Sequence, residues 1–134
     1  MSFFGKVYKL DRSENFDAFA ESLKLSPLET QALINIKSSQ KLDKDGDEYI
    51  LTTFYEGQSS EIKFKSGVEF DEILRADVTP KSVITVDGNK LTHVQKFQDG
   101  NSITCIREFS PEKLVVTITS NFWSGTAKRY FVAE

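Results

Sequence analysis

Turn signals recur along most of this chain, and they constrain its fold more than any other feature. From about residue 38 onward they stand roughly 10 to 20 residues apart. The turn signals are Asp45-Gly46, Ser66-Gly67, Asp87-Gly88, Asp99-Gly100-Asn101, Ser110-Pro111-Glu112 and Ser124-Gly125. The runs between them alternate between apolar and polar residues, a pattern that is typical of strands. The spacing therefore predicts an antiparallel meander.

With a first strand at Gly5–Leu10, we count about ten strands in 134 residues. So many strands in one small domain favour closure into an up-and-down β-barrel, because closure removes exposed strand edges. No linker, low-complexity tract or internal repeat divides the chain, so we expect residues 1–134 to form a single, mostly β domain. Barrels of this size commonly enclose a small ligand.

A helix is predicted directly after the first strand, because the hydrophobic period changes there. Phe16, Phe19, Ala20 and Leu23 follow the i, i+3, i+4, i+7 spacing of one helix face. Asn15 stands where a side chain could cap the helix.

A second helix is predicted to begin at Ser26. Ser26 serves as N-cap, Pro27 occupies the first helical position, and Glu29 completes a capping box. The apolar stripe of this helix is predicted at Leu28, Ala32, Leu33 and Ile36. Two short helices joined by a link of about three residues form a pair. We expect this pair to cover the mouth of the barrel as a lid.

Composition narrows the class of protein. The net charge of −3 disfavours non-specific nucleic-acid binding. The chain has no apolar run of transmembrane length, and its first residues lack the pattern of a signal peptide. Cys105 is the single cysteine, so no internal disulfide can form. We therefore expect a protein of the cytoplasm.

Two arginines stand in apolar rows of late strands. Arg107 lies on the row Ile103, Cys105, Arg107, Phe109, and Arg129 lies on the row Ala127, Arg129, Phe131. Either arginine could instead face solvent or pair with Glu108 or another carboxylate. Since there are two of them in a fold that leaves internal space, we favour an internal anion site. A carboxylate matches the guanidinium fork with strong, charge-assisted hydrogen bonds.

The remaining reactive residue types give no sign of a catalytic or metal centre. His93 shares a row with Gln95 and has no second histidine, so we interpret it as hydrogen-bonded within the core or a cavity. Cys105 has no base nearby in sequence and is interpreted as a structural thiol. The acidic run Asp43–Asp47 resembles the start of a calcium loop, but Phe54 stands where the bidentate Glu belongs. We therefore expect a hairpin there, and no enzyme, metal or cofactor.

Several blocks of sequence agree with one known family in collinear order. They are Lys6, Tyr8, Leu10, Asn15-Phe16-Asp17 and Phe19, then Phe64–Glu72, Val86–Lys96 and Ile106–Glu108, and finally Val116–Phe131. In these blocks the chain resembles the intracellular fatty-acid-binding proteins, and its last block resembles the insect midgut members in particular. The resemblance covers nearly the whole chain. It implies a ten-stranded, clam-like barrel with a two-helix lid and a large cavity for a long-chain fatty acid.

The resemblance also implies a site for the fatty-acid carboxylate. In the family, an Arg-x-Tyr pair on the last strand and an Arg on the eighth meet that group. Arg107 matches the latter and Arg129 the former, but Phe131 stands where the Tyr belongs. The alternative frame, Lys128-x-Tyr130, restores a hydroxyl but replaces Arg by Lys. We prefer the Arg129 frame, and we expect Gln40 to assist near the head group in place of the missing phenol.

Other matched positions imply roles around the ligand. Residues expected to line the cavity are Thr53, Tyr55, His93 and Gln95, and those expected around its opening are Phe16, Phe19, Leu23 and Tyr55. Gly57 stands where many relatives have a Phe at the opening, which would loosen the gate. Lys24 and Lys37, near the ends of the predicted helices, are either ordinary solvated lysines or part of a basic patch that touches anionic membranes.

The resulting hypothesis is a monomeric cytoplasmic carrier of long-chain fatty acids, for which transient membrane contact through the helical lid stays open. Two alternatives remain open. One is a carrier of another hydrophobic ligand, such as a retinoid or a sterol. Relatives that bind neutral retinol carry Gln at the position of Arg107, which argues against an uncharged head group. The other is an enzyme acting on lipids, for which the sequence shows no catalytic set.

Overall fold

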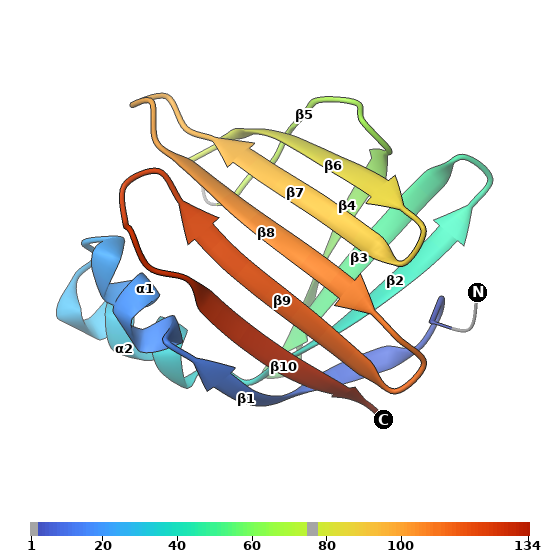
Figure 1. Cartoon of the computed structure of the whole chain (residues 1–134), viewed down its shortest axis with the longest axis horizontal. Helices are drawn as coiled ribbons and strands as arrows, with labels where there is room; N and C mark the ends of the chain where they lie inside the picture. The colour runs from blue at the N-terminus through green and yellow to red at the C-terminus, as the bar shows by residue number, and fades with distance from the viewer. Residues whose placement is uncertain (1–2, 75–77) are drawn as a thin grey trace.

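The computed structural model describes residues 3–74 and 78–134, which form ten strands and two helices. Figure 1 shows the strands wrapped into a nearly closed barrel, with both helices at one end. In chain order the elements are β1 (Val7–Glu14), α1 (Phe16–Ser22), α2 (Pro27–Asn35), β2 (Ser38–Asp45), β3 (Glu48–Tyr55), β4 (Gln58–Lys65), β5 (Phe70–Asp71), β6 (Lys81–Asp87), β7 (Lys90–Lys96), β8 (Ser102–Phe109), β9 (Lys113–Ser120) and β10 (Ala127–Ala133). The predicted ten-stranded barrel with a two-helix lid is confirmed.

The sheet is an antiparallel meander that is closed by its first and last long strands. The strand order is β4-β3-β2-β1-β10-β9-β8-β7-β6-β5, so β1 pairs with β10 as well as with β2. The two ends of this order are β4 and the two-residue β5. The first strand runs on to Glu14, four residues beyond the end predicted from sequence. Its pairing with β10 is irregular between Leu10 and Arg12, which re-aims the strand as it leads into α1.

Register decides which side chains face the interior, because residues directly opposite in an antiparallel pair point to the same face. Val116 of β9 lies opposite both Arg107 of β8 and Arg129 of β10, so these three side chains share a face. The same face carries the best-buried strand residues, which include Tyr8, Leu42, Leu51, Ile84, Leu91, Leu114 and Phe131. It is therefore the inner face of the barrel.

The end of the barrel away from the helices is filled by aromatic rings. Phe3 stacks on Phe109 with ring centroids 5.2 Å apart, and Tyr8 meets Phe109 edge-on at 5.5 Å. The Tyr8 hydroxyl donates a hydrogen bond to the carbonyl of Ser110 at 2.7 Å. Tyr49 and Phe64 form a further stacked pair at 5.4 Å. This end is closed by packing, so polar chemistry inside the barrel lies toward the middle and the helical end.

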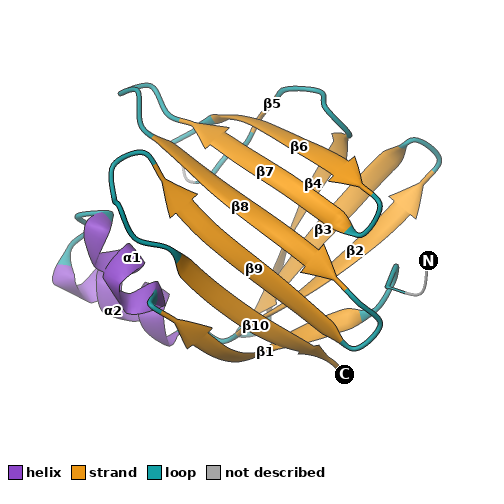
Figure 2. Cartoon of the chain, in the orientation of Figure 1, coloured by secondary structure: helices purple, strands orange, loops and turns teal. Residues whose placement is uncertain are grey.

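Helix α1 buries the face that its sequence predicts, with Phe16, Phe19 and Ala20 packed inward. It packs against α2 and β10, as Figure 2 shows for the helices at the barrel end. The capping prediction for Asn15 is wrong, because its side chain makes no cap hydrogen bond. Asn15 instead adopts a left-handed backbone conformation (φ 60°) and donates from Nδ2 to the Thr126 carbonyl at 3.2 Å. It thereby ties the start of α1 to the segment before β10.

Helix α2 begins as predicted, with a complete capping box between Ser26 and Glu29. Its predicted apolar stripe is wrong in part: Leu28 is 82% exposed and Ala32 is also exposed, whereas Leu33 and Ile36 are half-buried. Leu33 packs against the core, and the buried residue of the helix is Thr30. The helix packs mainly on α1, so there is little strand surface for a stripe to cover. Neither described helix has the length and apolar character needed to span a membrane.

Candidate ligand-binding site

The strand residues expected around a ligand all belong to the inner face. They are Gln40, Thr53, Tyr55, His93, Gln95, Arg107, Arg129 and Phe131. Gln40 lies opposite both Tyr8 and Thr53, and His93 lies opposite both Ile84 and Cys105. The alternating pattern of the sequence therefore assigns these side chains to the correct face.

Arg129 is a nearly buried cation with few protein partners. Its residue is 9% exposed, and its Nε donates one hydrogen bond to Oγ of Ser13, at 3.1 Å. Its guanidinium lies over the ring of Phe16, 4.0 Å from the centroid. Burial lowers the pKa of Arg129 from its ordinary value, but an arginine starts so high that it stays charged. Within the described chain, Arg129 has no ion pair with a carboxylate.

The alternative frame of the last strand points outward. Tyr130 lies on the outer face, where Arg12 stacks over its ring at 3.9 Å, and Lys128 shares that face. Phe131 is inside and only 1% exposed, opposite Leu10 and Leu114. The inner face thus has Arg129 and Phe131, without the hydroxyl that the family pattern places beside the arginine. Ser13, which sequence reasoning missed, supplies a hydroxyl to Arg129 instead.

Arg107 sits in a hydrogen-bonded network. Its Nε donates to Oε1 of Gln40 at 2.9 Å, and its Nη1 donates to Nδ1 of His93 at 3.2 Å. Gln40 was expected to assist near the head group; in the structure its amide oxygen is occupied by Arg107. Because the backbones of Arg107 and Arg129 are separated by two strand spacings, they lie roughly 10 Å apart.

The network continues from His93 to a buried carboxylate. Since Nδ1 of His93 accepts from Arg107, the neutral ring carries its proton on Nε2 and donates it to Oε1 of Glu72 at 2.8 Å. Burial lowers the pKa of His93 and the charge of Arg107 lowers it further, against the opposing effect of Glu72. We therefore treat His93 as neutral near neutral pH.

Glu72, which directly follows β5, is held by three donors from β6 and β7. Oε1 of Glu72 accepts from His93, from Oγ of Ser82 at 2.9 Å and from Nε2 of Gln95 at 3.1 Å. Burial opposes ionisation of this carboxyl, but the hydrogen bonds outweigh it and the pKa of Glu72 falls below its ordinary value. Sequence reasoning missed Glu72 as a site residue. The available signal was its place at the end of the Phe64–Glu72 block.

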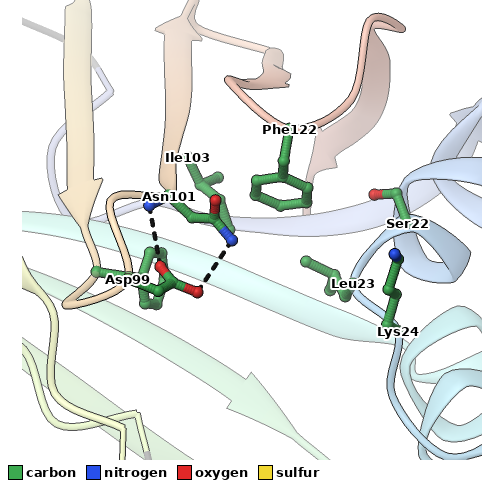
Figure 3. A pocket seen from close by; sticks show the side chains of 8 residues that line it. Ser22, Leu23, Lys24, Asp99, Asn101, Ile103 and Phe122 are labelled. Carbon is green, nitrogen blue, oxygen red and sulfur yellow. Dashed lines mark hydrogen bonds between the residues drawn. The ribbon is translucent and has the colours of Figure 1, made fainter.

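Among the residues that the structure describes, pockets open around the helical end and the edge of the sheet. One, of about 420 Å³, lies where the end of α1 meets the β7–β8 and β9–β10 turns. Figure 3 shows Leu23 and Phe122 in it, with Asp99 and Lys24 from opposite sides. A second, of about 430 Å³, lies between β4 and the residues that begin at β5. Tyr55 lines this second pocket. Tyr55 and Gly57 both line a third pocket, at the β3–β4 turn.

Of the four residues predicted around the opening, two line these pockets and two are buried. Leu23 lines the pocket beside α1, and Tyr55 lines the two pockets near the β3–β4 turn. Phe16 and Phe19 are buried instead, Phe16 beneath Arg129 and Phe19 against Trp123 with ring centroids 5.7 Å apart. The lid therefore reaches the arginine site through Phe16.

Comparison with known proteins agrees with this architecture. The model of the lipocalin / cytosolic fatty-acid binding protein family matches residues 5–127. The chain belongs to this family. Fatty acid-binding protein 2 of Manduca sexta is 47% identical over 133 residues, which span 99% of this chain and 100% of that protein.

Solved structures of family members superpose closely on the barrel. The fatty-acid-binding protein isolated from Manduca sexta gives a TM-score of 0.90 at 46% identity, covering 98% of this chain and 100% of that one. The fatty acid binding protein of Schistosoma mansoni, solved in complex with arachidonic acid, gives 0.87 at 29% identity, covering 99% and 96%. The relatives therefore share the fold over their whole length.

Proposed function

We propose that this protein binds long-chain fatty acids inside its barrel and carries them through the cytoplasm as a monomer. The observation that carries the proposal is Arg129, a nearly buried guanidinium on the apolar inner face, with no carboxylate ion pair within the described chain. A buried charge without a counter-charge is costly. A ligand carboxylate would supply that counter-charge.

The head group would lie against Arg129 and within reach of the Arg107 network. The N–H groups of Arg129 other than Nε have no hydrogen bond within the described chain, so they are available to a carboxylate. Phe131 would border the head group with an apolar ring, and the Ser13 hydroxyl would orient the guanidinium. Gln40 would act through Arg107, because its amide oxygen accepts a hydrogen bond from Nε of Arg107. The arginines would therefore select acids over alcohols and esters.

The alkyl chain would lie along the inner face toward the lid, past Thr53, Tyr55 and the apolar strand residues. Each buried CH₂ contributes about 0.8 kcal/mol, so roughly 15 methylenes give an upper limit near 12 kcal/mol before ordering costs. Apolar burial would thus supply most of the affinity and the arginines most of the head-group selectivity. His93 and Gln95 would line the polar side through their bonds to Glu72.

The relatives of this chain support the proposal. The Manduca sexta relatives are fatty-acid-binding proteins, and the Schistosoma mansoni protein was solved with arachidonic acid. We propose binding and transport rather than catalysis. We also propose that Lys24 and Lys37, both exposed beside the helices, touch anionic membranes when the ligand is transferred. Charge reversal of both lysines should then slow transfer to anionic vesicles, and unchanged rates would refute the membrane contact.

Native mass spectrometry of the purified protein tests the ligand class directly. We expect a bound mass that matches a long-chain fatty acid, and re-binding of that acid after delipidation. A retinoid or sterol in its place would refute the fatty-acid proposal in favour of another lipid carrier. Hydrolysis of a lipid ester, abolished by changing His93 or Cys105, would refute a pure carrier.

A further inference from the structure

The inner face holds an unequal number of positive and negative charges. Arg107 and Arg129 are cationic, and Glu72 carries the carboxylate of the network, while His93 is neutral. Among the other described strand residues that point inward, Lys44 is charged as well. Its side chain is exposed near the end of β2, so its charge is not counted with the interior. The interior is therefore one negative charge short of balance.

We infer that Glu72 is a specificity-determining residue: it balances one of the two arginines and so restricts the site to ligands whose head group carries a single negative charge. This inference rests on the proposed function. The ligand class that it selects is the monoanionic amphiphile, and the class that it rejects is the dianionic one, such as an alkyl phosphate.

The position of Glu72 suits this role because the carboxylate is buried and held in place by hydrogen bonds. The residue is 8% exposed, and His93, Ser82 and Gln95 all donate to the same oxygen within 3.1 Å. A carboxylate held by three donors from β6 and β7 cannot turn away to solvent without leaving those buried groups unpaired. Its charge is thus a permanent part of the interior.

The charge of Glu72 reaches Arg107 through His93. The ring is 3% exposed and uses both nitrogens, with Nδ1 accepting from Arg107 and Nε2 donating to Glu72. A carboxylate and a guanidinium joined by one neutral ring partly cancel each other. Arg129, on the other side of Val116, has only the Ser13 hydroxyl and the Phe16 ring within the described chain. One anion beside Arg129 completes the balance.

A second negative charge would find no cation left to balance it. The interior would then be net negative in a poorly solvated space, which is unfavourable unless a proton is taken up. A neutral head group would leave the interior net positive, because Arg129 would then lack a counter-charge. The same charge count therefore disfavours both alcohols and dianions.

The test compares a fatty acid with an alkyl phosphate of equal chain length at pH 8, where the phosphate is mostly dianionic. Displacement of a fluorescent fatty-acid probe gives both dissociation constants. We expect the wild-type protein to prefer the carboxylate, and Glu72→Gln to shift the ratio toward the phosphate about tenfold. The matched control is Glu69→Gln, which neutralises an exposed carboxylate three residues away and should leave the ratio unchanged.

A double variant tests whether the net charge of the interior decides the ligand preference. Glu72→Gln combined with Arg107→Gln returns the interior to one surplus positive charge, so the preference for the carboxylate should return. If Glu72 were only structural, Glu72→Gln would weaken both ligands alike and the second change would weaken them further. That outcome, or an unshifted ratio in a folded Glu72→Gln variant, overturns the inference.

Wild-type protein provides a measurement that does not depend on any variant folding. Calorimetric titration in two buffers with different heats of ionisation counts the protons taken up on binding. We expect no uptake for the fatty acid and about one proton for the alkyl phosphate, because the interior accepts one negative charge. Equal proton counts overturn the role of Glu72. Failure of the wild-type protein to bind the fatty acid at all would instead overturn the proposed function.

Discussion

Arg107 and Arg129 face the interior from positions opposite the same residue, Val116, yet their surroundings differ. Arg107 donates to Gln40 and His93, and through His93 it is linked to the carboxylate of Glu72. Arg129 has one hydroxyl and one aromatic ring within the described chain. The first arginine is satisfied largely by protein, whereas the second uses only its Nε in a hydrogen bond within the described chain.

The difference separates two tasks that a pair of arginines could share. A guanidinium already held by protein groups contributes mainly to the integrity of the polar network. A guanidinium that lacks a counter-charge costs stability but gains most when an anion binds. Removing Arg107 should therefore lower stability more than removing Arg129 does, and removing Arg129 should lower ligand affinity more.

Removing Arg129 should give the largest effect on binding. Arg129→Ala deletes the proposed anchor, and a charge-assisted hydrogen bond is worth about 1.5–3 kcal/mol, so fatty-acid affinity should fall about 10- to 100-fold. Calorimetric titration measures the loss. Lys128→Ala is the matched control, since Lys128 is the neighbouring cation on the outer face. A greater loss for Lys128→Ala would show that the other frame of the last strand forms the site.

Removing Arg107 should mainly lower stability. Arg107→Ala leaves the Gln40 oxygen and Nδ1 of His93 without their donor, at a cost of about 1–3 kcal/mol in the free energy of unfolding. Urea unfolding of the ligand-free protein measures this. We expect Arg129→Ala to cost less, because it removes a buried charge that has no carboxylate partner in the described chain. The reverse order would contradict the contrast between the two arginines.

Lowering the pH should weaken the network around Arg107 before it affects Arg129. The pKa of His93 is lower in the folded protein than its usual value, so the unfolded chain binds the proton first. The stability that a neutral His93 contributes is therefore complete above about pH 6.5 and is lost as the pH falls below that value. Urea unfolding between pH 7.5 and 5 should show this decline.

His93→Gln separates this titration from other groups. Its amide can accept from Arg107 and donate to Glu72 but does not titrate, so the slope between pH 6.5 and 5 should flatten. Glu72 contributes in a lower range: its pKa is also lowered, so its stabilisation is lost only below about pH 4.3. A slope that persists in His93→Gln would assign the pH dependence to a different group.

The fold could be predicted because its signals are repeated along the chain. Alternation and turns recur for every strand, so an error in one strand does not change the barrel. The capping box of Ser26 and Glu29 is also local, and it formed as predicted. The stripe of α2 failed in part because burial depends on what the helix packs against: α2 packs mainly on α1, Thr30 is buried, and Leu28 meets solvent. Likewise Asn15 found a partner at Thr126, far along the chain.

The candidate site was predictable to the level of a strand face and no further. Strand parity alone assigns Arg107 and Arg129 to apolar rows, and the register confirms that both point inward. Their partners come from distant segments: Ser13 from β1 and Gln40 from β2, with Glu72 from the residues after β5. Periodicity contains no information about such long-range contacts. The unequal treatment of the two arginines is therefore visible only once the register of the sheet is known.

Restoring a hydroxyl beside Arg129 should give the smallest effect. Phe131 is 1% exposed and opposite Leu10 and Leu114, in the position where the family pattern has a Tyr. Phe131→Tyr adds one donor to the carboxylate at nearly constant volume, so affinity should rise severalfold at most or stay unchanged, a gain limited by the cost of burying the hydroxyl. Paired titration with a fatty acid and its alcohol isolates the head-group term. A large loss of fatty-acid affinity would mean that the head group needs the apolar ring of Phe131.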